Sequence, residues 1–528
     1  MIALEHLSLS IHGTPILDDV SFDMAPGKVF GLVGESGSGK SMTALAIMGL
    51  LPRGAETSGR VMLDGGDLSK LRDRDLCAIR GNRIGMIFQE PMTALNPVKT
   101  IGEQVAETLL IHTRTSRAEA MKIAAEKLAR VGLPQDKFPL GRYPHELSGG
   151  QRQRVCIAMA IALHPELLIA DEPTTALDVT TQAQILDLLR DLVAEEGMSL
   201  LLITHDLAVV SGIADHVAVM QTGKIVEQGE TEQLFRHMTH PYTRQLFEAS
   251  GHQPDRAAPP NNAPMLTVEG AVRDYALPRR ALFGPAPTFR AVNGVSFTMN
   301  SGESVGLVGE SGCGKSTLTR AILGLEPLQG GNIRLFGKDM TPATARDLRA
   351  RIQVVFQDPY GSFNPRWRVE KLVAEPLHLL PSRPEDWRNR VALSLEEVGL
   401  PPDAMQRYPH EFSGGQRQRI AIARALILRP DLIILDEAVS ALDVSIRAQI
   451  LDLLAELQNR LGLAYLFISH DLSVVRTITD RVLVMRAGEI VEQGATEVVF
   501  AAPQHDYTRN LIAATPTIPD AWREDIHA

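Results

Sequence analysis

Short, unbroken apolar runs alternate with polar stretches along the chain, and three such runs in its first half stop at residues that can do chemistry. Val29–Val33 leads into a glycine-rich turn, Leu167–Ala170 ends in Asp171-Glu172, and Leu200–Ile203 ends in Thr204-His205. Continuous apolar runs of this length are typical of strands buried on both faces of a parallel sheet. Because ligands bind outside the carboxyl ends of such strands, the polar ends predict one shared site.

Between Gln89 and Asp171 the apolar spacing changes to a helical period. In the segment Ala118–Leu133, for example, Met121, Leu128 and Val131 fall at helical spacings. A mostly helical insertion is therefore expected within an α/β core.

The whole pattern occurs twice. The repeated stretches are GLVGESGSGKS (Gly31–Ser41) and GLVGESGCGKS (Gly306–Ser316), YPHELSGGQRQR (Tyr143–Arg154) and YPHEFSGGQRQR (Tyr408–Arg419), LLIADE (Leu167–Glu172) and LIILDE (Leu432–Glu437), ITHDL (Ile203–Leu207) and ISHDL (Ile468–Leu472), and HPYTRQL from His240 and HDYTRNL from His505. A repeat on this scale indicates duplication of an entire domain. We expect domains at 1–249 and 265–528, joined by a linker at 250–264 whose Pro, Ala and Asn content is typical of an extended, uncharged tether.

Size and composition agree with two globular domains. The chain has 528 residues, 44% of them hydrophobic and 22% charged, and a net charge of −10. An acidic balance argues against a nucleic-acid partner, and the widely spaced Cys77, Cys156 and Cys313 indicate free thiols in a reducing compartment. No apolar run is long enough to span a membrane, and the N-terminus has no signal-peptide pattern. The chain is expected to be cytoplasmic.

The glycine-rich turn is a phosphate-binding loop. GESGSGKS satisfies G-x-x-x-x-G-K-[ST], follows a predicted strand and precedes a predicted helix. Glycines let backbone N–H groups surround phosphate oxygens, Lys40 supplies a point charge to the β- and γ-phosphates, and the Ser41 hydroxyl suits Mg²⁺. The residues expected to bind ATP are Gly34, Glu35, Ser36, Gly37, Ser38, Gly39, Lys40, Ser41 and Met42, and in the second copy Gly309, Glu310, Ser311, Gly312, Cys313, Gly314, Lys315, Ser316 and Thr317.

The polar residues at the other strand ends suit roles in binding and hydrolysing a nucleotide held by this loop. Asp171 is expected to hold Mg²⁺ directly or through water, and Glu172 to polarise the attacking water. His205 suits a γ-phosphate contact, and Gln89 suits a ligand of Mg²⁺ or water. The catalytic prediction is therefore Glu172, His205, Glu437 and His470, and the metal prediction is Ser41, Gln89, Asp171, Ser316, Gln357 and Asp436. The alternatives are that Asp171-Glu172 is merely a solvated strand end and that His205 is a structural histidine.

A second anion-binding helix start lies in each half. Ser148, Gly149 and Gly150 precede an apolar helical pattern, which predicts a serine N-cap with small residues that expose free N–H groups. A complete LSGGQ between a phosphate-binding loop and an aspartate-glutamate strand end resembles the ABC ATPases. The resemblance covers nearly the whole chain twice, and it implies two tandem P-loop NTPase domains, each a RecA-like α/β core with an inserted helical subdomain.

The resemblance also implies how the halves cooperate. In that family each LSGGQ faces the nucleotide held by the opposite domain, so the chain would form its own head-to-tail dimer. Gly34–Ser41 would face Ser413–Gln416, and Gly309–Ser316 would face Ser148–Gln151. The further nucleotide-contacting residues implied are Gln89, Ser148, Gly149, Gly150, Gln151 and Asp178, and Gln357, Ser413, Gly414, Gly415, Gln416 and Asp443. Asp178 and Asp443 resemble the aspartates that bridge the two halves.

Finer details resemble one importer group. FQEPMTALNP (Phe88–Pro97), FQDPYGSFNP (Phe356–Pro365) and HPYTRQL look like the oligopeptide, dipeptide and nickel importer ATPases. A fused version of this length resembles the Yej-type importers of microcin C and oligopeptides; fused glutathione importer ATPases are the near alternative. A soluble ABC-F-like translation factor is the alternative from another class, but its long charged linker is missing here.

Partners and cofactors follow from the resemblance. It implies ATP and Mg²⁺, two transmembrane permeases that contact Glu90–Pro97 and Asp358–Pro365, a periplasmic or extracellular solute-binding protein, and a place on the cytoplasmic face of the inner membrane. Because the cysteines of the iron–sulfur members are missing, no cluster is expected. Met42 and Ala438 depart from the family's Thr and Pro without removing a charge, so two active sites are expected. The adenine-stacking residue is open, with His12 and Tyr275 as the nearest aromatic side chains.

Overall fold

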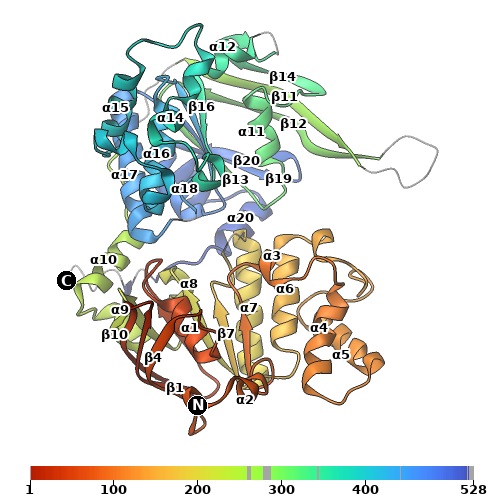
Figure 1. The fold of residues 1–528 in the computed structure, drawn as a ribbon. Coiled ribbons are helices and arrows are strands. Elements are labelled where there is room, and N and C mark those ends of the chain that lie inside the picture. The colour runs from red at the N-terminus through yellow and green to blue at the C-terminus, as the bar shows by residue number, and fades with distance from the viewer. Residues whose placement is uncertain are drawn as a thin grey trace. The chain divides into compact units, whose positions relative to one another are not determined.

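The structure is a computed structural model that describes residues 2–175, 177–257, 263–277, 287–341, 344–440, 442–519 and 521–522, with the side chains of 359 and 360 left out. The chain forms two compact units (Figure 1). Unit 1 comprises Met1–Leu177, Thr181–Gly251 and Pro516–Ala528, and unit 2 comprises Asp178–Thr180 and His252–Thr515. Compared with the expected limits of 1–249 and 265–528, Pro516–Ala528 groups with unit 1, and the linker residues from His252 group with unit 2.

The core of unit 1 is a six-stranded sheet in the order β10-β9-β3-β8-β7-β6. Its strands are β3 (Val29–Val33), β6 (Ile84–Ile87), β7 (Leu167–Asp171), β8 (Ser199–Thr204), β9 (His216–Gln221) and β10 (Lys224–Glu230). β6, β7, β8, β3 and β9 pair in parallel, and β10 is antiparallel. The three apolar runs of the sequence are thus neighbouring parallel strands, as predicted.

Both faces of this sheet are covered, which explains the continuous apolar runs. Successive strand side chains point to opposite faces. Leu167 and Ile169 of β7 pack with a smaller sheet and helix α1, whereas Leu168 and Ala170 pack with the helices on the other side. The smaller sheet has the order β2-β1-β4-β5 and consists of β1 (Ile2–Ile11), β2 (Thr14–Met24), β4 (Ala55–Leu63) and β5 (Gly66–Asp67).

The helices of unit 1 include the expected insertion, which lies to one side of the sheet as α3 to α6 (orange in Figure 1). The helices are α1 (Lys40–Met48), η1 (Leu68–Lys70), α2 (Asp73–Cys77), α3 (Pro91–Ala94), α4 (Ile101–His112), α5 (Arg117–Arg130), η2 (Pro144–Glu146), α6 (Gly149–Ala160), α7 (Val179–Glu196), α8 (Leu207–Ile213), α9 (Thr231–Arg236) and α10 (Pro241–Ser250). α5 matches the helix predicted over 118–133, with its end three residues earlier because Gly132 takes a positive φ.

Unit 2 repeats both sheets and the helical insertion. Its large sheet has the order β16-β17-β18-β13-β19-β20, and its small sheet β12-β11-β14-β15. The strands are β11 (Pro264–Ala276), β12 (Thr288–Asn300), β13 (Ser304–Val308), β14 (Gly330–Leu335), β15 (Lys338–Asp339), β16 (Ile352–Val355), β17 (Leu432–Asp436), β18 (Ala464–Ile468), β19 (Arg481–Arg486) and β20 (Glu489–Ala495). The helices are α11 (Lys315–Ile322), α12 (Ala345–Arg349), α13 (Pro359–Ser362), α14 (Val369–Val373), η3 (Glu375–Leu379), α15 (Trp387–Glu397), η4 (Pro402–Gln406), η5 (Pro409–Glu411), α16 (Gly414–Leu426), α17 (Val444–Leu461), α18 (Leu472–Ile478), α19 (Thr496–Ala501) and α20 (Asp506–Ala513).

The C-terminal segment is part of the core of unit 1. Ile518 and Trp522 are buried in an apolar cluster with side chains of β9, α9 and α10. The Trp522 ring stacks on Phe235, with the ring centroids 6.0 Å apart. Throughout the described residues, every helix is too short or too polar to cross a bilayer.

The first half of the linker is packed rather than free. Arg256 donates from Nη2 to Asp480 Oδ1 at 2.9 Å, and both side chains are 12% exposed. His252 pairs with Asp452 at 2.6 Å, and the Ala257 N–H donates to Asn459. The expected tether is therefore, over 252–257, a segment of unit 2; residues 258–262 lie outside the described residues.

Unit 1 shows why the linker contributes an arginine. Its matching carboxylate, Asp215, accepts from Val29 N and from Lys28 Nζ, each at 2.9 Å. In unit 2 the residue before β13 is Glu303, so that position supplies no cation to Asp480. Arg256 supplies it from the linker.

Replacing Arg256 with alanine should lower the free energy of unfolding of unit 2 by roughly 1.5–3 kcal/mol, the value of a hydrogen bond to a charged partner. Calorimetry or denaturant titration of the full chain measures it. Arg290→Ala is the matched control, because it removes an exposed ion pair with Asp274 that is worth less than about 1 kcal/mol. Equal losses in the two variants would contradict a structural role for the linker arginine.

Candidate functional site

The predicted phosphate-binding loop joins β3 to α1. Gly34, Gly37 and Gly39 have φ values of +153°, +80° and +107°, which residues other than glycine rarely adopt. A Cβ on Gly34 would lie 2.2 Å from the Met220 carbonyl oxygen, so the loop fits against β9 only with glycine there. The sequence therefore folds this segment into a ring of backbone at the carboxyl end of β3.

The Lys40 ammonium lies inside that ring. Nζ donates to the carbonyl oxygens of Gly34 at 2.8 Å and Glu35 at 2.9 Å, and the residue is 5% exposed. A buried ammonium enclosed by backbone and placed at a helix N-terminus forms a strong anion site.

Asp171 and Ser41 meet beside the loop. The Ser41 hydroxyl donates to Asp171 Oδ1 at 3.1 Å. Burial raises the pKa of Asp171 to about 6, against the effect of the Ser41 hydrogen bond. A hydroxyl and a carboxylate oxygen are the hard ligands that Mg²⁺ prefers, so these two residues fit the predicted metal site.

Glu172 is held by three side chains. Its carboxylate accepts from Gln89 Nε2 at 2.9 Å and from Thr175 Oγ1 at 2.9 Å, and its Oε1 lies 3.2 Å from His205 Nδ1. Burial raises the pKa of Glu172, but the hydrogen bond and charge of His205, followed by the Thr175 hydrogen bond, outweigh it and bring the pKa to about 2. An ionised carboxylate is thus fixed next to the loop. Gln89 contacts Glu172 here, whereas it was predicted as a ligand of Mg²⁺ or water.

The loop of unit 2 repeats the placement of the lysine and of the two carboxylates, but the hydrogen bond of Ser41 to Asp171 has no counterpart between the described Ser316 and Asp436. Lys315 Nζ donates to the oxygens of Gly309 at 2.6 Å and Glu310 at 2.8 Å. Burial raises the pKa of Asp436. His470 Nδ1 lies 3.2 Å from Glu437 Oε1. Burial raises the pKa of Glu437, but the hydrogen bond from His470 and the charge of His470 outweigh it and lower the pKa.

The two carboxylates differ in their support. Ser440 stands where unit 1 has Thr175, and its hydroxyl donates to the Glu437 backbone oxygen at 2.9 Å instead of to the carboxylate. Among the described residues, His470 is the one side chain that forms a hydrogen bond or ion pair with the Glu437 carboxylate, and Gln357 forms none with it. The Glu437 side chain is 23% exposed and that of Glu172 is 10% exposed. Unit 1 therefore holds its carboxylate more firmly.

The predicted serine caps are present in both units. Ser148 Oγ accepts from Gln151 N at 3.3 Å and caps α6, and Ser413 Oγ accepts from Gln416 N at 3.4 Å and caps α16. A Cβ on Gly150 would lie 2.3 Å from Thr181 of α7, which explains the second glycine. Gly149 and Gly414, the first residues of the two helices, are exposed, whereas Gly415 is buried.

The aromatic candidates for adenine differ between the units. The Tyr275 hydroxyl donates to Glu326 at 2.5 Å and lies 3.4 Å from Thr317 Oγ1 of the loop, and Arg273 stacks on its ring at 4.8 Å. His12 lies in the turn after β1, where a Cβ on Gly54 would lie 2.4 Å from its ring. Tyr275 is thus fixed beside the loop of unit 2.

Two tyrosines that the sequence analysis left without a role contact the loops. Tyr242 and Tyr507, from the repeated HPYTRQL and HDYTRNL stretches, accept from Glu35 N at 3.2 Å and from Glu310 N at 3.0 Å. Both stretches follow the last strand of a large sheet, β10 or β20, and their repetition was the available signal in the sequence. Nothing local in the sequence relates them to the loops.

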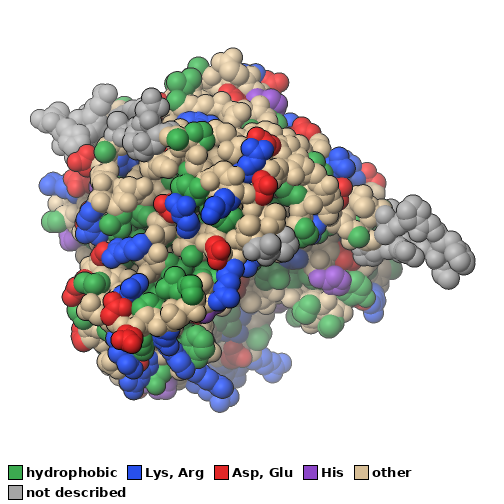
Figure 2. All heavy atoms as spheres, turned by 90° about the horizontal axis from the view of Figure 1, so that it is seen from above, with side chains coloured by type: hydrophobic (Ala, Val, Ile, Leu, Met, Phe, Trp, Pro, Cys, Tyr) green, Lys and Arg blue, Asp and Glu red, His purple; other side chains and the backbone are tan. Residues whose placement is uncertain are grey.

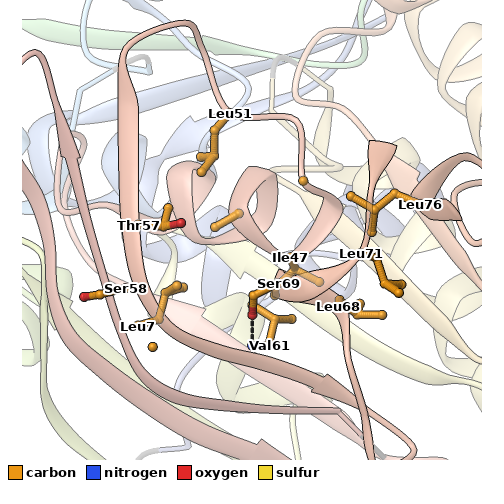
Figure 3. A pocket seen from close by; sticks show the side chains of 13 residues that line it. Leu7, Ile47, Leu51, Thr57, Ser58, Val61, Leu68, Ser69, Leu71 and Leu76 are labelled. Atoms are coloured by element: carbon orange, nitrogen blue, oxygen red, sulfur yellow. Dashed lines mark hydrogen bonds between the residues drawn. The ribbon is translucent and has the colours of Figure 1, made fainter. Parts of the chain in front are cut away.

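A cavity of about 130 Å³ in unit 1 lies away from these residues. Figure 3 shows the lining side chains Leu7, Ile47, Leu51, Val61 and Leu68, which come from the small sheet, α1, the loop after α1 and η1. Its lining combines aliphatic side chains with the exposed Thr57 and Ser58 and contains none of the predicted site residues, so it is not the predicted nucleotide site.

Each unit thus brings together a buried ammonium, an aspartate whose pKa is raised by burial, and an ionised carboxylate next to an imidazole; unit 1 adds the hydrogen bond between Ser41 and Asp171. That set suits phosphoryl transfer to water, in which positioning and charge stabilisation provide most of the catalysis.

Comparison with known proteins agrees with this chemistry. Residues 17–175 and 292–440 match the ABC transporter family, and residues 226–267 and 491–528 match the C-terminal region of oligopeptide/dipeptide transporters. The chain is 49% identical over 532 residues to the peptidoglycan transport ATP-binding protein YejF of Agrobacterium fabrum, covering 97% of this chain and 96% of that protein. It is 48% identical over 537 residues to the glutathione import ATP-binding protein GsiA of Escherichia coli (strain K12), covering 94% and 86%.

Among solved structures, the dimeric post-hydrolysis state of the ATP-binding cassette MJ0796 bound to ADP and Pi aligns over 44% of this chain and 99% of its own, at 31% identity and a TM-score of 0.40. The sequence matches confirm the resemblance inferred from the motifs, together with the two-domain α/β fold that it implies. The chain belongs to the ABC transporter family, and its two units are ATP-binding ATPase domains of an importer.

Proposed function

We propose that this ATPase energises the import of peptides of the oligopeptide and microcin C type. The observation that carries the proposal is the match of both ATPase domains to the C-terminal region of oligopeptide/dipeptide transporters, each copy following its own large sheet. Glutathione, a small peptide, is the near alternative, because a relative named for its import is 48% identical. A dipeptide or nickel cargo belongs to the same group.

In the proposed mechanism the loop residues from Gly34 and from Gly309 hold the phosphates. Ser41, Asp171 and Gln89 in unit 1, and Ser316, Asp436 and Gln357 in unit 2, would hold Mg²⁺ directly or through water. The metal would supply positive charge to the β- and γ-phosphates. Glu172 and Glu437 orient the attacking water, while His205 and His470 face the γ-phosphate. Tyr275 stacks on adenine at the second site.

The two sites are proposed to be completed across the chain. Ser148, Gly149, Gly150 and Gln151 would meet the nucleotide bound by Lys315, and Ser413, Gly414, Gly415 and Gln416 the one bound by Lys40. Asp178 and Asp443 would bridge the halves of this head-to-tail pair. The serine caps and the exposed first glycines of α6 and α16 support this role, because a helix start of that kind attracts a phosphate.

Two permeases and a solute-binding protein are proposed as partners, at the cytoplasmic face of the inner membrane. The segments Glu90–Pro97 and Asp358–Pro365 would receive the permeases. Met92 within the first segment is 65% exposed and Val98 directly after it is 79% exposed, and both provide apolar contact area.

A soluble factor that acts on ribosomes is the alternative from another class. Nucleic-acid binding favours a one-signed basic patch. Figure 2 shows Lys and Arg side chains interspersed with acidic, hydrophobic and uncharged ones on the visible face. The net charge of −10 also favours the importer.

A strain that lacks this gene should lose uptake of a labelled oligopeptide and regain it with the wild-type chain, but not with the Glu172→Gln, Glu437→Gln variant. Uptake of glutathione and Ni²⁺ is measured in parallel. Loss of glutathione uptake with normal peptide uptake would favour the alternative cargo. Sedimentation of the variant with ribosomes and not with membranes would reject the importer role.

Both sites should hydrolyse ATP, with the faster turnover in unit 1, because Glu172 has the firmer support. Turnover is measured in Glu437→Gln, which leaves the first site active, and in Glu172→Gln, which leaves the second. The double variant should lose about a hundredfold or more in turnover and still bind ATP. Full wild-type turnover in one single variant, with none in the other, would show that one site does no hydrolysis.

The crossed arrangement is checked by photolabelling. In a Lys40→Ala background, a photoreactive γ-phosphate ATP analogue should load the Lys315 site and label Tyr143–Arg154, because the Ser148 helix start then faces that nucleotide. Peptide mapping reads out the result, and Lys315→Ala is the mirror-image control, expected to label Tyr408–Arg419. Label confined to the domain that binds the analogue would contradict the head-to-tail pair.

A further inference from the structure

The two tyrosines that reach the phosphate-binding loops belong to a local arrangement present in both units. In unit 1, Glu227 of β10 accepts from Thr239 N at 2.7 Å and His240 N at 3.2 Å, and His240 Nδ1 accepts from Tyr242 N at 3.2 Å. These bonds fix the turn into α10. Tyr242, Leu246 and Phe247 of that helix are buried against the large sheet of the unit.

Unit 2 repeats each of these contacts. Glu492 of β20 accepts from Gln504 N at 2.7 Å and His505 N at 3.0 Å, and His505 Nδ1 accepts from Tyr507 N at 3.0 Å. Gln504 and Asp506 stand where unit 1 has Thr239 and Pro241, so the sequence of the turn differs while these backbone hydrogen bonds are the same.

Each tyrosine hydroxyl meets a particular peptide group of the loop. Tyr242 accepts from the N–H of Glu35, and that N–H belongs to the same peptide as the Gly34 carbonyl, which accepts from Lys40 Nζ at 2.8 Å. In unit 2 the Gly309–Glu310 peptide is held in the same way, by Tyr507 at 3.0 Å and Lys315 at 2.6 Å. The tyrosine and the lysine thus bind opposite ends of one peptide plane.

This geometry links the orientation of the lysine to the tyrosine. A peptide group bonded at both ends cannot rotate without losing a hydrogen bond, and each bond polarises the other. Tyr242 is 5% and Tyr507 6% exposed, so water cannot readily replace the hydroxyl. The Tyr242 hydroxyl also lies 3.4 Å from Glu35 Oε2, which fixes its own proton.

We infer that Tyr242 and Tyr507 are positioning residues for the P-loop lysines of their own domains, through which the oligopeptide-type C-terminal region of each domain sets its affinity for ATP. The inference rests on the proposed roles of Lys40 and Lys315. A tyrosine that merely fills the core would contribute to stability but not to ATP affinity.

Tyr242→Phe keeps the ring and removes the hydroxyl. In a Lys315→Ala background, which leaves the Lys40 site to bind ATP, it should raise the Kd for ATP about two- to tenfold, the equivalent of one hydrogen bond. In the same background Tyr507→Phe should leave that Kd unchanged, although it is the same substitution in the same motif. In a Lys40→Ala background, where ATP binds at the Lys315 site, Tyr507→Phe should raise the Kd for ATP and Tyr242→Phe should leave it unchanged. In the otherwise wild-type chain, each variant should raise the KM for ATP and leave kcat within twofold.

Tyr465→Phe controls for loss of any buried tyrosine hydroxyl, because this side chain is buried and donates to Leu454 O, away from the loops. Lower thermal stability in Tyr242→Phe with an unchanged Kd would overturn the inference, as would equal changes in Kd at both sites. Persistent ATP binding in the Lys40→Ala, Lys315→Ala chain would instead reject the assignment of the loops, and the inference with it.

Discussion

The register of three parallel strands is the constraint on which the site depends. In unit 1, Val33 of β3 lies opposite Thr204 of β8, and Asp171 of β7 lies opposite Ile203. These pairs bring the glycine-rich loop, the carboxylates and His205 to one edge, although the residues are far apart in sequence. A shift of one strand by a single residue would exchange its side chains between the two packed faces and place them where residues of other sizes fit, so close packing on both faces fixes the geometry of the chemistry.

The two adjacent carboxyl groups of this site, those of Asp171 and Glu172, lie in different environments and have different pKa values. Asp171 and Glu172 are neighbours, yet burial raises the pKa of one and the histidine contact lowers the pKa of the other. The two side chains reach different surroundings because Glu172 has a φ of +46°, which turns consecutive carboxylates in different directions. The same strained residue recurs at Glu437, with φ of +49°, so the backbone device is kept even where the hydrogen-bonding partners are not.

The elements that sequence reasoning predicted well are those with a local signal. Continuous apolar runs identified β3, β7 and β8 to within a residue, and serine followed by glycines identified the starts of α6 and α16. The elements it missed depend on distant partners. Nothing near Arg256 indicates Asp480, and nothing near Tyr242 indicates Glu35, because those bonds form only once the sheet is assembled. The support of Glu172 by Thr175 was missed for a related reason: rotamer and backbone decide whether a hydroxyl reaches the carboxylate or, as in Ser440, the main chain.

Carrying both ATPase domains on one polypeptide affects how their sequences can diverge. Two separately encoded subunits are made in amounts that vary, whereas a single message delivers one copy of each half with every molecule. A substitution such as Ala438, or Cys313 in place of the serine of the first loop, is then never present without its unaltered counterpart. Selection therefore acts on the two halves together.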